Sequence, residues 1–388
     1  MEMKGDRISE LPDSILHNEI LSRLPTRCVL ATSILSKRWR WLWTGVPNLK
    51  FSCFGKISCG PDKPAMFMNF VDNVLLRHDI SNLHCFKLGC FGICDISRVH
   101  SWISTVAHSK LRELYLKIYE LDSNVIPMSV YCCEALVVLE IFFLGSKFNP
   151  PTSISLPSLK TLKLNSLSFV DDDHDLMQQF FSSLPALQHL ILLRCRFHDY
   201  KKLIISSTSL NSLRIENSDF EPFYRSDPVI KVCAPQLRDL YFETSTPARE
   251  YILSSMPVLQ EAYISAPAYR DPTNLTYLEL FGCYDGPDVL RLLQVMPNLE
   301  HLIFNQLVSG SSEDDLTLYI GEMLPPCFHS KIKEIQISEY GYLSEDFPMI
   351  NFLLNNIEDL KITENTYSTD SWGDEIKTIR LVRDSLDS

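Results

Sequence analysis

The chain has 388 residues, of which 45% are hydrophobic and 22% charged, a composition typical of a globular protein with one long domain and a small one. Its net charge of -12 argues against a nucleic-acid partner, because neutralising phosphates requires a concentrated basic face. No apolar stretch approaches the roughly 20 residues of a membrane span, and the N-terminus lacks the apolar core of a signal peptide. We therefore expect an intracellular protein, cytoplasmic or nuclear, that binds neither nucleic acid nor membrane.

The N-terminal segment has the spacing of a compact helical unit. Leu16, Ile20 and Leu24 recur at i, i+4 and i+8, which places them on one face of a helix. A second short helix ends in a segment with Trp39 and two further tryptophans within five residues. This is more apolar surface than so small a unit can cover by itself, so we expect part of it to face a partner.

Charge also distinguishes this segment from the rest of the chain. Residues 1–50 carry eight Lys and Arg against five Asp and Glu, whereas the remainder is strongly acidic. An acidic partner for the N-terminal segment is therefore electrostatically favoured.

From residue 83 onward the sequence repeats the motif Leu-x-x-Leu-x-Leu, at intervals close to the 20–29 residues typical of leucine-rich repeats. In such a repeat each motif is a short strand of a parallel sheet, with its Leu positions in the core and the alternate residues pointing outward. The twelve copies begin at Leu83, Leu111, Leu136, Leu159, Leu187, Leu210, Leu237, Leu259, Leu275, Leu299, Ile332 and Ile357.

The segments between the motifs differ in character. Helical spacing predicts helices over 66–78, 98–107, 175–184 and 288–296, the first of which opens the repeat region. Other connections, 200–209 and 217–236, are too short or too β-branched to predict a helix. The interval after Leu259 is too short for a full repeat, so we expect an irregularity near 267–272.

The N-terminal residues closely resemble the F-box of the large plant F-box/leucine-rich-repeat family. In one respect the sequence departs from the family pattern, since 14–23 is one residue longer than the commonest spacing. The residues that carry the resemblance are Asp6-Arg7-Ile8-Ser9-x-Leu11-Pro12-Asp13, Ile20-Leu21-Ser22-x-Leu24-Pro25-Thr26 and Ala31-Thr32-Ser33-x-Leu35-Ser36-Lys37-Arg38-Trp39-Arg40-x-Leu42-Trp43.

A C-terminal stretch, from Leu324 to Leu360, looks like the FBD domain found in the same family. Its matching residues include Leu324-Pro-Pro-Cys327, Ile335, Ile337 and Phe352-Leu353-Leu354-Asn355-Asn356. With the two resemblances, we divide the α/β chain into a small all-helical F-box and a solenoid with a curved parallel sheet. The boundaries are 1–50 for the F-box, 51–65 for a linker, 66–320 for leucine-rich repeats, 321–364 for an FBD-like end and 365–388 for a tail that could be a strand, a helix or a polar extension.

The resemblance implies a non-catalytic subunit of an SCF-type ubiquitin ligase. The F-box would bind a Skp-type adaptor and, through it, a cullin and a RING protein, while the repeats would bind an unknown protein substrate. No catalytic residue, cofactor or metal is implied. The adaptor-binding residues would be Leu11, Pro12, Ile15, Leu16, Ile20, Leu21, Leu24, Pro25, Leu35, Trp39, Leu42 and Trp43, with Lys37, Arg38 and Arg40 at the rim.

For the substrate, strand geometry predicts which residues are exposed. The central outward positions of successive motifs are Tyr115, Glu140, Lys163, Ile191, Arg214, Tyr241, Tyr263, Glu279, Ile303 and Gln336. The aromatic and arginine residues among them and beside them have the composition of binding hot spots, so we predict substrate contacts by Arg214, Arg238, Tyr241, Tyr263 and Tyr277.

Other interpretations compete with this one. The chain could be a scaffold or substrate-trapping decoy that keeps an F-box-like module but acts outside a ligase, or a hydrolase, although no nucleophile, phosphate-loop or zinc-protease motif supports an enzyme. A metal site is conceivable at Cys85, Cys90, Cys94, His84 and His100, but without a Cys-x-x-Cys pair buried repeat cysteines explain them better. The acidic run 171–175 could bind a cation, but is better explained as a solvated loop before a helix.

Overall fold

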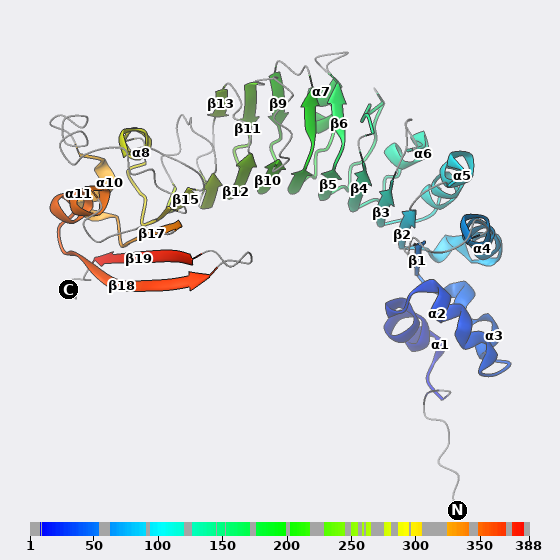
Figure 1. Cartoon of the computed structure of the whole chain (residues 1–388). Coiled ribbons are helices and arrows are strands. Elements are labelled where there is room, and N and C mark those ends of the chain that lie inside the picture. Colours follow the sequence, from blue (N-terminus) through cyan, green and yellow to red (C-terminus); the bar gives the residue numbers. More distant parts are fainter. Residues whose placement is uncertain are drawn as a thin grey trace, which may run out of the picture. The chain divides into compact units, whose positions relative to one another are not determined.

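A computed structural model shows a chain of two compact units, Met1–Leu187 and Gln188–Ser388, which we describe separately (Figure 1). The structure describes residues 8, 10–53, 63–90, 94–119, 126–144, 146–151, 153–170, 176–198, 202–217, 229–244, 250–254, 258–259, 261–264, 275–280, 286–294, 296–304, 324–340, 348–369 and 375–383.

The first unit opens with a small module of short helical segments. Two prolines, Pro12 and Pro25, precede its two longest helical runs with φ of -58° and -59°, the angle that proline fixes and that suits a helix start. The segments are α1 (Asp13–Ile15), η1 (Leu16–Ile20), η2 (Leu21–Arg23), α2 (Thr26–Ala31), η3 (Thr32–Ile34), α3 (Trp39–Leu42) and η4 (Trp43–Gly45).

The first helical run contains a π-helical turn, η1. The side chains of Leu16 and Leu21, five positions apart, are fully buried, whereas Ile20 and Leu24 are half-buried. The expected i, i+4, i+8 face of Leu16, Ile20 and Leu24 is therefore wrong. A π turn spaces its hydrogen bonds five residues apart and so accommodates one residue more than an α-helical turn.

A parallel sheet follows in the first unit, with helices between its strands (Figure 1). The expected helices over 66–78, 98–107 and 175–184 are confirmed as α4 (Lys63–Arg77), α5 (Ile96–Ala107) and α7 (Leu176–Ser182). Shorter connections are η5 (Ile80–Asn82), α6 (Met128–Tyr131) and β6 (Ser168–Val170). The strands, in their order across the sheet, are β1 (Asn48–Ser52), β2 (Cys85–Cys90), β3 (Glu113–Ile118), β4 (Val138–Phe143) and β5 (Thr161–Asn165).

The second unit continues the repeat with strands in place of several helices. Its sheet runs in the order β7 (His189–Leu193), β10 (Ser212–Asn217), β12 (Asp239–Thr244), β14 (Glu261–Ile264), β15 (Tyr277–Leu280), β16 (His301–Phe304) and β17 (Glu334–Tyr340), all parallel. The helix expected over 288–296 is confirmed as α8 (Gly286–Leu293). Two further helices among the described residues are α10 (Pro326–Ser330) and α11 (Pro348–Asn356).

The two connections for which no helix was expected contain strands. β9 (Lys202–Ser206) and β11 (Val229–Cys233) pair in parallel, and β13 (Glu250–Ser254) joins them in a second sheet. Their Ile and Val side chains favour extended backbone, because branching at Cβ is tolerated better in a strand than in a helix. A further short strand is β8 (Arg196–His198). The irregularity expected near 267–272 lies outside the described residues.

The C-terminal end reverses the strand direction. β18 (Leu360–Thr369) and β19 (Glu375–Arg383) form an antiparallel pair, and β19 also pairs antiparallel with β17. Of the forms left open for 365–388, the described residues therefore adopt strands. Ile379 and Leu381 of β19 are fully buried, so this strand contributes to the core.

The core follows the leucine motif. The first residue of every one of the twelve copies is buried, with at most 2% of its surface exposed. Within the part of the chain that the structure describes, no helix is both long and apolar enough to cross a membrane.

Candidate interaction surfaces

The N-terminal module buries much of its apolar surface in its own core. Of the twelve predicted adaptor-binding residues, Leu11, Ile20 and Leu24 are half-buried and Pro12, Ile15, Pro25 and Leu35 are exposed. The remaining five, which fill the core, are Leu16, Leu21, Trp39, Leu42 and Trp43.

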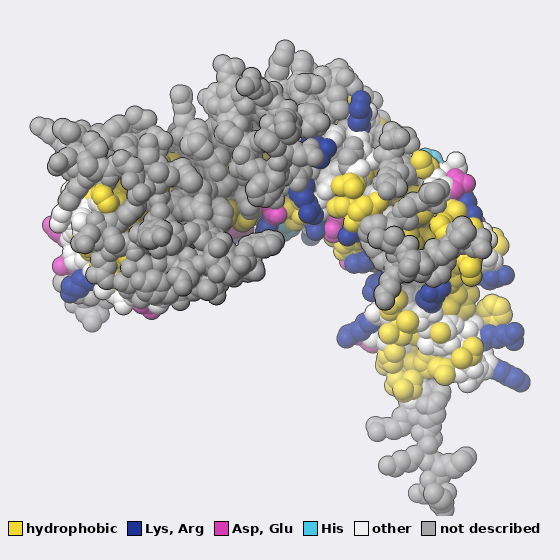
Figure 2. All heavy atoms as spheres, viewed as in Figure 1, with side chains coloured by type: hydrophobic (Ala, Val, Ile, Leu, Met, Phe, Trp, Pro, Cys, Tyr) yellow, Lys and Arg dark blue, Asp and Glu magenta, His cyan; other side chains and the backbone are white. Residues whose placement is uncertain are grey.

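Exposed apolar side chains are nevertheless concentrated on this module. The described residues include ten large apolar side chains that are exposed, and half of them lie between residues 8 and 41. Figure 2 shows yellow side chains gathered over the module, flanked by Lys and Arg. We call these residues the exposed apolar set: Ile8 (53% exposed), Ile15 (40%), Ile34 (85%), Leu35 (64%) and Trp41 (61%).

Trp41 is a candidate site residue that the sequence analysis did not select. Trp39 and Trp43 are four residues apart and share the buried face of the helical run, which leaves Trp41, two residues from each, on the opposite face. The Arg40 guanidinium lies near the Trp41 ring, with its Cζ 5.9 Å from the ring centroid. The helical spacing of the three tryptophans could have identified Trp41 as the outward one.

Arg38, just before α3, bonds the residues at the start of the first helical run, which begins with α1. Its Nη2 donates to the Asp13 carboxylate at 2.5 Å and to the Leu11 carbonyl. Arg38 was expected at the rim, facing an acidic adaptor, but its guanidinium is engaged within the chain and holds Leu11 to Asp13 in place. Lys37 and Arg40 are exposed.

Hydrogen bonds join the module to the first strand and helix of the sheet. The Lys50 backbone N–H in β1 donates to Thr26 Oγ1 at 2.7 Å, and the Asp79 backbone N–H, just after α4, donates to the Thr44 carbonyl at 2.8 Å. The buried His78 Nε2 lies 2.9 Å from the Val46 carbonyl, to which the neutral ring can donate. The module is thus fixed to the repeats at several points.

Burial of His78 favours the neutral form of its ring. Burial lowers the pKa of its imidazole below the ordinary value of 6.5, and this effect outweighs the hydrogen bond to Val46 and the charge of Asp79, which raise the pKa. Its Nδ1 is buried and has no hydrogen-bond partner, so a proton there would lack an acceptor.

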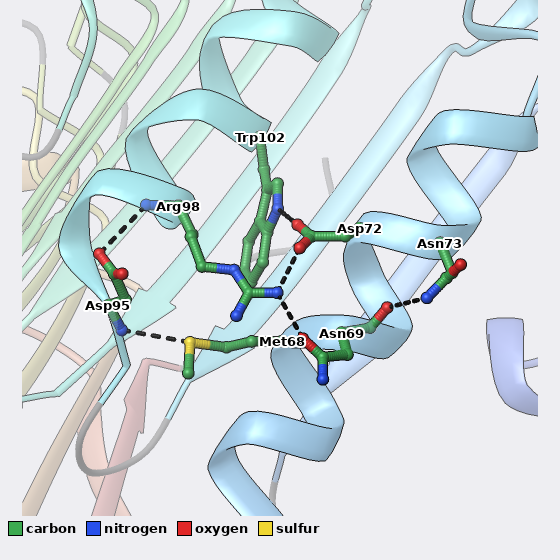
Figure 3. A network of polar contacts seen from close by, with 7 residues as sticks. All are labelled: Met68, Asn69, Asp72, Asn73, Asp95, Arg98 and Trp102. Carbon is green, nitrogen blue, oxygen red and sulfur yellow. Dashed lines mark hydrogen bonds and ion pairs between the residues drawn. The ribbon is translucent and has the colours of Figure 1, made fainter.

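Asp72 links α4 to α5 through a polar network (Figure 3). Its carboxylate accepts a bond from Trp102 Nε1 at 2.5 Å and pairs with the Arg98 guanidinium, which also donates to Asn69 Oδ1 at 2.9 Å. Asp95 caps the N-terminus of α5 by accepting from backbone N–H groups. The network therefore fixes α4 and α5 to each other.

The predicted row of outward residues is confirmed in the first unit. Tyr115, Glu140 and Lys163 are register partners on β3, β4 and β5, and Lys87 and Lys50 continue the row on β2 and β1. Lys87 Nζ lies 3.6 Å from the Tyr115 ring centroid, and Lys163 Nζ lies 3.0 Å from Glu140 Oε1.

The row is confirmed in the second unit as well, where it brings three of the predicted substrate residues together. Arg214, Tyr241 and Tyr263 are register partners on β10, β12 and β14. The Arg214 Cζ lies 4.0 Å from the Tyr241 ring centroid, and the Tyr241 and Tyr263 rings stack with centroids 4.1 Å apart. Arg214 is also held by Glu216, at 2.7 Å.

The other two predicted substrate residues lie beside this stack. Tyr277 is on β15, where its hydroxyl donates to Glu279 Oε2 at 3.3 Å. Arg238 precedes β12 and is exposed, and its backbone N–H donates to the Asn211 carbonyl at 2.8 Å. The sheet therefore offers a preformed stack of one arginine and two tyrosines, with a third tyrosine on the next strand.

The structure does not bring Cys85 together with Cys90 and Cys94, as the metal site considered from the sequence would require. Cys85 lies beside Glu113, and burial raises its pKa to about 12. Cys90 and Cys94 instead approach Cys53, and the hydrogen bond with Cys53 is the main cause that raises the pKa of Cys94 to about 11. Among the described residues no group of three or more His, Cys, Asp and Glu could hold a metal ion. The acidic run 171–175 lies outside the described residues.

Comparison with known proteins identifies two regions. The F-box domain matches residues 8–51. The leucine-rich repeats of the FBD-associated F-box protein At5g56370 match residues 99–268.

Proteins of Arabidopsis thaliana are similar over nearly the whole chain. The probable FBD-associated F-box protein At1g32375 is 34% identical, over 94% of each chain. The FBD-associated F-box protein At4g10400 is 31% identical over 90% of each chain. A third, At5g60610, is 28% identical over 92% of this chain and 98% of its own length.

Proposed function

Because this chain belongs to the plant family of FBD-associated F-box proteins with leucine-rich repeats, we propose that it is the substrate-recognition subunit of an SCF-type ubiquitin ligase. In this proposal the F-box binds a Skp-type adaptor, which connects it to a cullin and a RING protein, and the repeats bind the protein to be ubiquitinated. The chain supplies no catalytic group. It raises the concentration of the substrate near the ubiquitin-carrying enzyme. A cytoplasmic or nuclear location is part of the same proposal.

The exposed apolar set is the observation that carries the adaptor proposal. Ile34 and Leu35 expose 85% and 64% of their surface although the core of the module is already filled by other side chains. Large apolar side chains concentrated on one small module are typical of a surface that a partner covers. The exposed cations Lys37 and Arg40 would accelerate the approach of an acidic adaptor.

The substrate proposal is supported by the outward rows. The stacked Arg214, Tyr241 and Tyr263 are held by one another and by the strands, so little side-chain entropy is lost when a partner contacts them. Rigid aromatic and arginine side chains are the residue types that dominate binding energy at protein interfaces.

Co-purification tests the adaptor contact. We expect the double variant Ile34→Asp, Leu35→Asp to lose a co-expressed Skp-type adaptor, because two charges would be buried without partners at the interface. Leu144→Asp is the matched control, since Leu144 is a 52% exposed apolar residue outside the module. Equal recovery of adaptor with the wild type and the double variant would refute the proposed surface.

A reconstituted complex separates a ligase subunit from a scaffold or decoy. The chain, adaptor, cullin and RING protein are mixed and the assembly is measured by size-exclusion chromatography. We expect one complex that contains all four proteins. Recovery of the chain with the adaptor but without the cullin would favour the scaffold.

A further inference from the structure

Lysines dominate the outward face of the sheet in the first unit. Lys50, Lys87 and Lys163 lie in one register row, and Lys117 is the next outward residue along β3. Among the outward residues of β1 to β5, all of which the structure describes, the carboxylates are Glu113 and Glu140. Four lysines against two glutamates give this face a positive charge on a chain whose net charge is -12.

Aromatic rings hold two of these lysines. Lys87 Nζ is 3.6 Å from the Tyr115 ring centroid, and Lys117 Nζ is 5.1 Å from that of Phe142 and 5.7 Å from that of Tyr119. A lysine that rests on a ring loses less side-chain freedom when it binds an anion, because its ammonium group is already placed.

The two glutamates on this face already accept bonds from the chain. Glu113 Oε2 accepts from the Tyr115 hydroxyl at 3.1 Å, and Glu140 pairs with Lys163 at 3.0 Å. The same face in the second unit has the opposite balance among its described residues. Its cations among these are Arg214, Lys361 and Arg380, of which Arg214 and Arg380 pair with Glu216, Glu334 and Glu364. Further carboxylates there are Asp239 and Glu279.

We propose that the outward face of β1 to β5 binds an extended segment of the substrate that is rich in Asp and Glu. This inference rests on the proposed function as a substrate receptor. The four cations are all lysines, spread over strands roughly 4.8 Å apart, which suits single contacts to spaced carboxylates. Of the four, Lys50 Nζ also donates to the Ser22 carbonyl at 3.1 Å, so the proposed contacts are those of Lys87, Lys117 and Lys163. Recognition of a phosphate group favours the planar fork of arginine, and this face has no arginine among its outward residues.

Peptide binding to the purified full-length chain tests the proposal. The probe is a fluorescein-labelled peptide of about eight residues, enough to cross five strands, with Asp or Glu at alternate positions. Fluorescence anisotropy measures its affinity, and an Asn/Gln peptide of the same pattern is the reference. We expect the acidic peptide to bind about tenfold or more tightly than the reference, and its affinity to fall as salt is added.

Three substitutions locate the binding face. The triple variant Lys87→Gln, Lys117→Gln, Lys163→Gln should bind the acidic peptide about tenfold or more weakly. The triple variant with Arg at the same positions should retain binding, because it keeps the charge. The matched control changes three exposed lysines elsewhere in the chain to Gln: Lys147, Lys331 and Lys361. It alters the net charge by the same amount and should leave the affinity for the acidic peptide unchanged.

Three outcomes would overturn the inference. These are equal affinity for the acidic and the reference peptide, equal loss of affinity in the two Gln variants, and binding of a matched phosphoserine peptide without binding of the acidic one. The adaptor is absent from this assay, so its result does not depend on adaptor binding. A chain that binds the peptide through these lysines but fails to co-purify with the adaptor would refute the ligase role alone.

Discussion

The rings of Tyr241 and Tyr263 stack in parallel on neighbouring strands of the second unit, with their centroids 4.1 Å apart and an angle of 2° between their planes. A stacked aromatic pair stabilises a fold by about 0.5–1.5 kcal/mol beyond the area it buries. We expect a double-mutant cycle of Tyr241→Ala and Tyr263→Ala, measured by urea unfolding, to show a coupling of this size.

The control cycle pairs Tyr241→Ala with Tyr115→Ala, since Tyr115 lies on β3 of the first unit. Distant substitutions should add to within about 0.5 kcal/mol. Equal coupling in the two cycles would contradict a direct contribution of the stack.

Truncation of Trp39 should affect mainly the stability of the chain, whereas truncation of Trp41 should affect mainly its affinity for the adaptor. Trp39 is 5% exposed, so Trp39→Ala creates a cavity and should lower the free energy of unfolding by about 3–5 kcal/mol. Trp41 is 61% exposed, so Trp41→Ala should leave the stability within about 0.5 kcal/mol and weaken adaptor binding by about 2 kcal/mol. Urea unfolding and calorimetric titration with the adaptor measure the two effects. Unchanged adaptor affinity in Trp41→Ala would exclude it as an anchor.

Asp72 should be important for stability because it bonds both Arg98 and Trp102. Asp72→Ala leaves the Trp102 indole N–H without its acceptor, and we expect a loss of about 1–3 kcal/mol in the free energy of unfolding. Trp102→Phe in the same background removes the orphaned donor and should recover part of this loss. Asn73→Ala, on the exposed side of α4, is the control and should cost little. Equal stability of Asp72→Ala and the control would contradict the role of the network.

The joint between the F-box and the repeats should weaken in acid. Because the pKa of the folded His78 is below its ordinary value of 6.5, the unfolded chain binds more protons at acidic pH. The contribution of the neutral ring is complete above about pH 6.5 and is lost as the pH falls below it.

Urea unfolding across this pH range measures the effect of His78. We expect His78→Gln to lose less stability on acidification than the wild type. A wild-type pH dependence in His78→Gln would show that another group is responsible.

The repeat architecture could be predicted from the sequence because the leucine motif has two periodicities, one between successive motifs and one within each motif. The spacing of motifs gives the strands, and the alternation within each motif gives the side on which each residue lies. Since parallel strands of equal motifs align their leucines, the outward row from Tyr115 to Lys163, and that from Ile191 to Gln336, followed directly. Helices were found where the apolar spacing was helical, as in α5 and α8.

Features that depend on tertiary contacts could not be predicted in the same way. The π turn at Leu16–Ile20 could not be predicted, because an extra residue can lie in a loop, a bulge or a helical turn, and packing determines which of these forms. The antiparallel pairing of β19 was hidden because strand propensity does not specify a partner. The exposure of Trp41 could be predicted from helical geometry, because Trp39 and Trp43 are four residues apart and share one face of the helix, with Trp41 between them.

The reversal of strand direction at the C-terminal end determines where the polypeptide can be cut for expression. β19 lies between β17 and β18, so a fragment that stops after the last leucine motif would lose the strand that separates them and leave Ile335 and Ile337 without their neighbours Leu381 and Ile379. Such a fragment would present an unpaired sheet edge, which promotes aggregation. A soluble repeat fragment should therefore extend at least to Arg383, and should begin before β1 so that the opposite edge keeps its own first strand.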